Sequence, residues 1–324
     1  MNNNYTFKEF YYQVYRPHHP ELDVKTRESR ETLMMKYVFN DIGNLLIQDI
    51  DVYTINDYLR NLSERDLSDS TSRQIFEEIR RTFKLAVCKG IIQQQRFPCF
   101  SKRISHPRAC LPFIQSSAPP ESYTMQELKS LSESLGSDQI SLMFRLALYA
   151  GLKQDEIQAL TISDYNPQSK ILCIKKALRW SDRNYHNHTI VLLSQADRKR
   201  RSIFLTLPAQ KVIEQAIQAV METAANTSDD NDNCFIFRNR IGNPHSGALF
   251  RAFARKIEQK SKVQHISIRR CRNTFIVLCF QNGWSETDVM EYLGFSAPLN
   301  VLPYKRIAMN ASEASNCTQH EVNL

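Results

Sequence analysis

Residues 93–121 interrupt the chain with prolines at separated positions and with several Lys and Arg side chains, and no helical or strand periodicity runs through them. Proline cannot continue a helix, because it lacks a backbone N–H and clashes with the preceding turn. The stretch therefore divides the 324 residues into two parts, each close to the usual length of one domain. We expect a folded domain at 1–92, an extended basic interdomain linker at 93–121 and a second domain at 122–307.

The first part shows the apolar spacing of amphipathic helices. Segments 26–46 and 68–92 repeat apolar residues every three or four positions, and a further helix is expected to begin near Thr54. Gly90 lies where the last of these helices should stop, since glycine is common just after a helix end. The pattern predicts an all-helical domain with a small core and a surface rich in Lys and Arg.

The second part mixes helical and strand patterns. It opens with Thr124 and Glu127, whose spacing is that of a capping box at a helix start. Runs rich in β-branched residues at 170–176, 188–194 and 201–207 predict three strands of one small sheet, and helical patterns fill most of the remainder. The predicted fold class is mainly α with a small antiparallel β-sheet, an α+β arrangement.

The charge balance favours a polyanionic partner. The net charge is +8 and the pI is near 9.0, and Lys and Arg bind nucleic acids by neutralising phosphates. The alternative is a soluble protein that is merely basic. The 8 cysteines include no CxxC pair, so we expect reduced core thiols and no zinc site. No apolar run approaches the roughly 20 residues that cross a bilayer, so we expect a soluble protein without membrane contact.

Cations cluster around the predicted strands, with Trp180 and Tyr185 between them. A run of charge is usually only a solvated face, but cations interleaved with aromatic residues favour contact with nucleic-acid phosphates. The linker adds further cations, although it could equally be an ordinary tether. The residues expected to contact DNA are Lys175, Lys176, Arg179, Arg183, Arg198, Lys199, Arg200, Arg201, Lys102 and Arg103.

Three motifs in order give the second part a family resemblance. They are GLKQDEIQAL at 151–160, RRCRNTFIVLCFQNGW at 269–284 and EYLGFSAPLNVLPY at 291–304. Together with the predicted strands, they resemble the conserved boxes of the tyrosine recombinase and phage integrase family. The resemblance implies a helical, SAM-like core-binding domain at 1–92, a catalytic domain at 122–307 and a polar C-terminal tail at 308–324.

The family's chemistry implies roles for particular residues. A tyrosine hydroxyl attacks a DNA phosphodiester and forms a 3′-phosphotyrosyl link without a metal or cofactor, while two arginines hold the phosphate. The resemblance places the nucleophile at Tyr304 and the second arginine at Arg272. The family's set also includes two histidines and a lysine on a β-hairpin. The resemblance implies substitutions at the remaining positions: Lys153 for the first arginine, Arg269 for the first histidine, Phe295 for the second histidine, and Gln195 or Ala196 for the hairpin lysine.

These substitutions leave three functions open. The leading hypothesis is an integrase-like protein of a mobile genetic element that binds specific double-stranded DNA sites and cleaves them weakly, close to a pseudoenzyme. The second is an active site-specific recombinase that uses Tyr304, and the third is a non-enzymatic DNA-binding regulator. The resemblance further implies a homo-oligomer on DNA, either dimer or tetramer, a possible second recombinase as partner, and a nucleoid-associated place in the bacterial cytoplasm.

Overall fold

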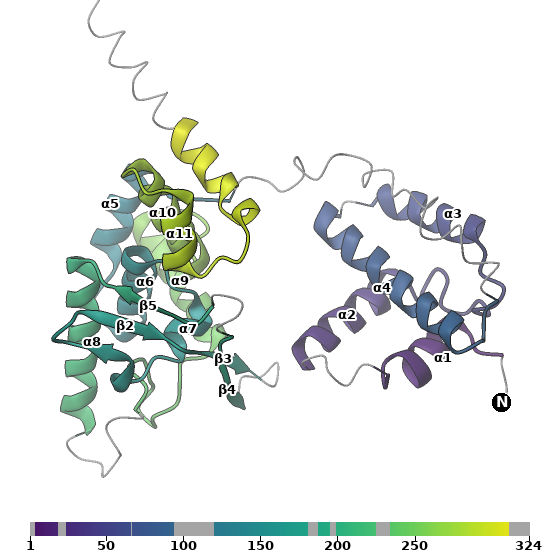
Figure 1. The fold of residues 1–324 in the computed structure, drawn as a ribbon, viewed down its shortest axis with the longest axis horizontal. Coiled ribbons are helices and arrows are strands. Elements are labelled where there is room, and N and C mark those ends of the chain that lie inside the picture. The colour runs from purple at the N-terminus through teal and green to yellow at the C-terminus, as the bar shows by residue number, and fades with distance from the viewer. Residues whose placement is uncertain are drawn as a thin grey trace, which may run out of the picture. The chain divides into compact units, whose positions relative to one another are not determined.

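The computed structural model describes residues 4–18, 24–65, 67–93, 120–180, 187–194, 199–224 and 234–310 (Figure 1). The chain divides into two compact units, Met1–Ala118 and Pro119–Leu324, each with its own hydrophobic core. Most of the predicted linker and most of the predicted tail lie outside the described residues. The exact domain limits therefore stay a prediction.

The first unit is helical. Its elements are α1 (Phe7–Phe10), a π-helical turn (Tyr11–Tyr15), α2 (Val24–Tyr37), α3 (Val52–Ser63) and α4 (Asp69–Cys88). Side-chain caps fix where two of the helices begin, because Asp51 accepts the N–H of Thr54 and Ser68 accepts that of Thr71. Phe7 stacks on Phe83 with ring centroids 5.2 Å apart, and this contact joins α1 to α4 in the core.

One predicted helix of this unit is shorter than expected. Apolar spacing continues to residue 46, but α2 ends at Tyr37. The N–H groups of Val38 and Phe39 both bond to the carbonyl of Met34, which widens the last turn and lets the chain leave the helix axis. Apolar spacing shows which residues reach the core, and turn residues can reach it as well as helical ones.

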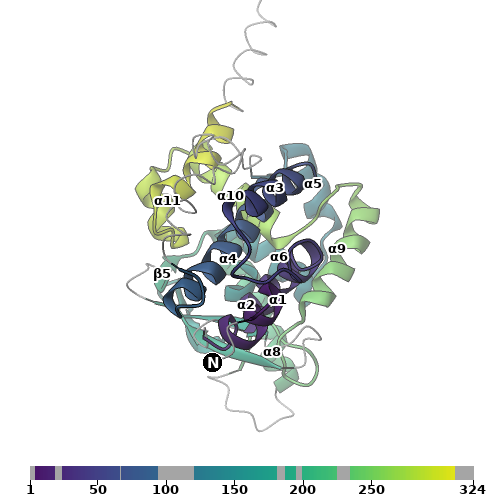
Figure 2. The ribbon, with the colours of Figure 1, turned by 90° about the vertical axis from the view of Figure 1, so that its right-hand side faces the viewer.

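The second unit surrounds a central apolar helix, α6 (Gln139–Ala150), which packs among α8, α9 and α10 (Figures 1 and 2). The predicted capping box is confirmed, since Thr124 and Glu127 exchange hydrogen bonds at the start of α5. A further helix covers residues 302–310. The other helices are α5 (Met125–Ser134), α7 (Gln154–Gln158), α8 (Leu207–Ala224), α9 (Gly247–Ser261), α10 (Ile268–Gln281) and α11 (Glu286–Leu293).

The strands form two antiparallel groups rather than one sheet. β1 (Tyr165–Asn166), β2 (Ile171–Ile174) and β5 (Arg201–Phe204) pair in the order β1-β2-β5, with Cys173 opposite Ser202. β3 (Lys176–Trp180) and β4 (His188–Leu192) make a separate two-stranded ribbon. The prediction of a single three-stranded sheet from the runs at 170–176, 188–194 and 201–207 was therefore wrong. The second run pairs with residues just after the first, because nearby segments close a hairpin at a lower entropy cost.

No helix in the described part of the chain is long and apolar enough to cross a membrane.

Gly151, which ends α6, is expected to tolerate no side chain. Its φ is +64°, and an added Cβ would lie 2.5 Å from Phe275 Cδ1 and 2.6 Å from Leu293 Cδ2. Gly151→Ala should lower the free energy of unfolding by roughly 2–5 kcal/mol, adding about 1–2 for a left-handed alanine and about 1–3 for overpacking. Urea denaturation followed by tryptophan fluorescence measures this, because both tryptophans, Trp180 and Trp284, belong to the second unit.

Gly283→Ala is the matched control for that experiment. Gly283 also has a positive φ of +83°, but an added Cβ would meet nothing within 4 Å. Its cost should therefore be confined to the backbone term of about 1–2 kcal/mol. Equal destabilisation by the two substitutions would contradict the packing argument.

Candidate active site

Three separate segments of the second unit bring the predicted catalytic residues together. Lys153 stands at the start of α7, Arg272 and Arg269 lie on α10, and Tyr304 lies on the helix of residues 302–310. Their charges act on one another, since Arg272 influences the pKa of both Lys153 and Tyr304. Residues far apart in the sequence thus share one site.

Arg272 is held rigidly beneath this site. Its side chain is buried and donates hydrogen bonds to the carbonyls of Gly151 and Leu293, the latter at 3.2 Å. The guanidinium carbon lies 5.2 Å from the centroid of the Phe295 ring. Burial lowers the pKa of Arg272 to about 10, although the charge of Glu156 opposes this effect. The group therefore remains a cation at neutral pH, in a fixed position.

Lys153 is a cation at the N-terminus of α7, and its side chain is held less firmly than that of Arg272. Its backbone N–H donates to Glu156 Oε2 at 3.0 Å, and its Nζ lies 3.9 Å from Glu156 Oε1. Burial lowers the pKa of Lys153, and the neighbouring charge of Arg272 lowers it further, while Glu156 raises it. Its amine therefore gives up a proton more readily than that of a surface lysine.

Arg201 is paired inside the protein rather than offered to a ligand. Its guanidinium donates to both carboxylate oxygens of Glu156, each at 3.0 Å, and its Nε donates to the carbonyl of Tyr292 at 2.8 Å. The side chains are only 6% and 2% exposed. Burial alone would raise the pKa of Glu156, but the charge and hydrogen bonds of Arg201 hold it below its usual value. This geometry contradicts the expectation that Arg201 contacts DNA.

Lys176 is a second cation that the structure places differently. Its Nζ lies 3.0 Å from Asp164 Oδ2 and donates to Thr161 Oγ1 at 2.7 Å. The pair fixes the start of β3 against the turn before β1, and the Lys176 side chain stays 20% exposed. Its phosphate contact stays a prediction. Breaking the pair would leave the buried Asp164 carboxylate without its partner, which is costly.

Other predicted DNA contacts remain on the surface. Arg179, Lys199 and Arg200 are exposed, and Lys175 is half-buried. Arg269 is exposed as well and makes no ion pair with any residue that the structure describes. The remaining predictions, Arg183, Arg198, Lys102, Arg103 and Gln195, lie outside the described residues.

Tyr304 is half-buried and has a defined partner. Its hydroxyl donates to Asn273 Oδ1 at 3.0 Å, and its ring packs against the cluster that contains Leu293 and Val301. Burial raises the pKa of Tyr304, although the charges of Arg272 and Arg269 oppose this. Sequence reasoning missed Asn273. Its place directly after Arg272, inside the motif at 269–284, was the available signal.

Phe295 fills the position of the second family histidine. It is partly buried and packs against the same cluster as Tyr304, below the guanidinium of Arg272. A phenyl ring neither donates a hydrogen bond nor titrates, so this position offers packing and a cation–π contact only.

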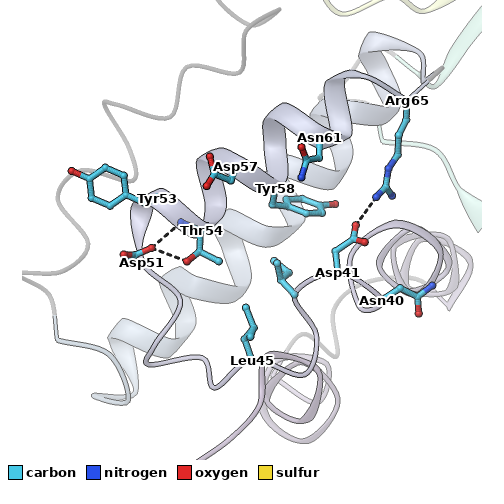
Figure 3. A pocket seen from close by; sticks show the side chains of 11 residues that line it. Asn40, Asp41, Leu45, Asp51, Tyr53, Thr54, Asp57, Tyr58, Asn61 and Arg65 are labelled. Atoms are coloured by element: carbon cyan, nitrogen blue, oxygen red, sulfur yellow. Dashed lines mark hydrogen bonds and ion pairs between the residues drawn. The ribbon is translucent and has the colours of Figure 1, made fainter.

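The first unit holds a pocket of its own, of about 680 Å³ (Figure 3). Two of its carboxylates already have partners: Asp41 pairs with Arg65 at 2.8 Å, and Asp51 accepts hydrogen bonds from Thr54 (Figure 3). The pocket therefore belongs to the packing and capping of α3.

A helical unit, followed by an α+β unit that gathers a tyrosine, an arginine and a lysine at one site, defines the class of tyrosine recombinases. The profile described as "Phage integrase family" matches residues 124–310, and that of the "Phage integrase SAM-like domain" matches residues 6–104. The chain belongs to the phage integrase family.

Known proteins agree with this assignment. The curated "Tyrosine recombinase XerC-like" protein of Caldanaerobacter subterraneus subsp. tengcongensis is 21% identical over 80% of this chain and 68% of its own length. Among solved structures, the Tn1549 transposon integrase with a circular intermediate DNA has a TM-score of 0.73 at 17% identity, covering 93% of this chain and 95% of that one. A lambda integrase dimer bound to a core site has a TM-score of 0.61 at 13% identity, covering 90% and 93%. These structures share the fold.

Proposed function

We propose that this protein binds specific duplex DNA sites and that Tyr304 cleaves one strand there, at a rate reduced by the substitutions around it. The observation that carries the proposal is the arrangement of Tyr304, Arg272 and Lys153. Arg272 donates to the carbonyl of Gly151, two residues before Lys153, and Asn273, the residue after Arg272, accepts the hydroxyl of Tyr304. Structural relatives are described in complex with a circular intermediate DNA and with a core site, which supports DNA as the substrate. A mobile genetic element is the setting that this chemistry fits.

In the proposed reaction, the phenolic oxygen of Tyr304 forms a bond to phosphorus as the bond from phosphorus to the 5′ oxygen breaks. The phenolic proton passes to solvent, and the leaving 5′ oxygen takes a proton from Lys153 or from water. One phosphodiester replaces another, so no cofactor has to supply energy. Arg272 and the exposed Arg269 neutralise the charge on the nonbridging oxygens.

Local geometry supports a slow reaction. The tyrosine begins protonated, because burial raises its pKa. Phe295 supplies no hydrogen bond to the phosphate, and a lysine at position 153 lacks the planar fork of arginine. Loss of one such donor costs about 3 kcal/mol in comparable sites, or a factor of roughly 100 to 1,000.

The exposed cations form the proposed DNA surface. Arg179, Lys199, Arg200 and Arg269 lie on the second unit with their side chains in solvent. Because strand exchange needs two cleaved duplexes, a dimer or tetramer on DNA fits this function, and a second recombinase could supply missing groups. These partners, and a location at the bacterial nucleoid, belong to the same proposal.

Two assays test the proposal on the full chain. Sites selected from a randomised duplex library should bind with an affinity that falls at least about a hundredfold between 50 and 200 mM salt. The same duplexes, nicked in turn near each phosphate of the site, should trap a denaturant-resistant adduct whose tryptic peptide contains Tyr304. Absence of selective, salt-sensitive binding would refute the proposal.

A second function is a DNA-binding regulator that does not cleave. The phenylalanine at 295 and the raised pKa of Tyr304 favour it, since both remove reactivity without touching the exposed cations. Firm site-specific binding without any adduct on the full set of nicked duplexes would establish this function instead.

Lys153→Arg should raise the rate of adduct formation by about tenfold. An arginine at the start of α7 restores a planar pair of donors, and one further charge-assisted hydrogen bond is worth about 1.5 kcal/mol. Single-turnover trapping at saturating DNA measures the rate. Lys211→Arg, on an exposed residue of α8, is the control and should leave the rate unchanged. A slower Lys153→Arg reaction would show that the lysine is needed as a proton donor.

A further inference from the structure

Asn273 has a place in the site that the residue pattern does not explain. It lies on α10 between Arg272 and Thr274 and is only 5% exposed. Both the nitrogen and the oxygen of its side-chain amide make hydrogen bonds. Its Nδ2 donates to the carbonyl of Glu121 at 3.0 Å, and its Oδ1 accepts the hydroxyl of Tyr304 at 3.0 Å. It therefore links the first turns of the second unit to the tyrosine.

The two contacts fix the direction of each hydrogen bond. A backbone carbonyl can only accept, so the amide nitrogen of Asn273 must face Glu121. The amide oxygen is then turned toward Tyr304, and an amide oxygen can only accept. The phenolic proton must consequently point at Asn273, which leaves the oxygen lone pairs directed elsewhere.

The backbone partner is itself immobilised. Arg270 donates to the carbonyl of Ser122 at 3.1 Å, and the N–H of Tyr123 donates to Thr274 Oγ1 at 2.8 Å. The Arg270 guanidinium also covers the Tyr123 ring, with 4.1 Å to the ring centroid. The two residues that follow Glu121 are thus attached to α10, so the carbonyl of Glu121 is held in place and the amide of Asn273 cannot turn over at low cost.

We propose that Asn273 is a positioning residue for the nucleophile, holding the Tyr304 hydroxyl through an acceptor whose orientation the Glu121 carbonyl fixes. The inference rests on the proposed function, in which Tyr304 attacks. An amide oxygen is too weak a base to take the phenolic proton, so Asn273 orients the oxygen and is not the general base. A misplaced nucleophile loses much of the advantage of a bound substrate, which makes one hydrogen bond consequential.

The test compares Asn273→Leu with Tyr292→Phe, both in the full chain. Leucine resembles asparagine in shape but makes neither hydrogen bond. Tyr292→Phe removes a hydrogen bond to the carbonyl of Phe204 beside the same apolar cluster, but no bond to Tyr304 or to residues 121–123. Asn273→Leu should slow single-turnover adduct formation at saturating DNA by roughly ten- to a hundredfold. DNA affinity should stay at the wild-type value, and Tyr292→Phe should keep the wild-type rate.

Equal slowing by both variants would mean a purely structural role and overturn the inference, as would a wild-type rate in Asn273→Leu. Failure of the proposed function looks different, because the wild-type protein itself would then form no Tyr304-linked adduct. In that event, acetylation of Tyr304 by N-acetylimidazole, read by peptide mass spectrometry, tests the contact alone. Tyr304 should be modified more in Asn273→Leu than in wild type or Tyr292→Phe, and equal modification in all three would overturn the inference.

Discussion

Tyr304→Phe is expected to reduce the covalent protein–DNA adduct to background while leaving duplex affinity within about twofold of the wild-type value. Phenylalanine keeps the ring that packs beside Leu293 and Val301, and it removes only the hydroxyl that donates to Asn273. Without the phenolic oxygen no bond to phosphorus can form, whereas the exposed cations remain. Adduct trapping on nicked duplexes and a binding titration on the same DNA measure the two effects.

Tyr292→Phe provides the control. Tyr292 packs against the same cluster, and its hydroxyl donates to the carbonyl of Phe204 at 3.3 Å, on the side of β5. Its replacement removes a tyrosine hydroxyl of the same neighbourhood but no proposed nucleophile, so the adduct should persist. An adduct that survives in Tyr304→Phe would assign the attack to another residue and reject the proposed chemistry.

Arg201→Met is expected to lower the free energy of unfolding of the second unit by about 3–5 kcal/mol. Methionine fills a similar volume but leaves the Glu156 carboxylate buried without its bidentate partner. A buried charge that loses its partner costs far more than the net contribution of the pair. Tryptophan fluorescence during urea denaturation reports this unit, because Trp180 and Trp284 both lie in it.

A double substitution and a change of pH separate this cause from lost packing. The double variant Arg201→Met/Glu156→Gln has neither charge of the pair, and its glutamine can still accept the N–H of Lys153. Most of the lost free energy of unfolding should therefore return. In wild type the folded pKa of Glu156 is depressed, so its contribution is full above the unfolded pKa and is lost as pH falls through the folded pKa. In Arg201→Met protonation relieves the buried charge. The stability gap between the two proteins should therefore narrow from pH 7 to pH 4, and a constant gap would indicate packing alone.

The local structure of the chain could be predicted from the sequence. The capping pair Thr124 and Glu127 and the helix stop at Gly90 are present as hydrogen bonds and as a backbone φ of +71°. Each depends on residues within a few positions of one another, so spacing and residue type are sufficient. The mainly helical fold class and the family follow from the same kind of information, because periodic apolar spacing and ordered motifs lie in the linear chain.

The tertiary structure alone decided which polar groups are available for chemistry. Arg201 and Lys176 belong to the same basic cluster as Arg179 in the sequence, but buried Glu156 and Asp164 take the first two and leave the third exposed. Those partners lie 45 and 12 positions away along the chain. Over such separations, the sequence does not indicate which side chains lie close together in space. Likewise, the bond from Tyr304 to Asn273 spans 31 positions. A buried charge or hydroxyl is costly unless it has a partner. Which partner lies close enough depends on tertiary packing, which no local sequence pattern encodes.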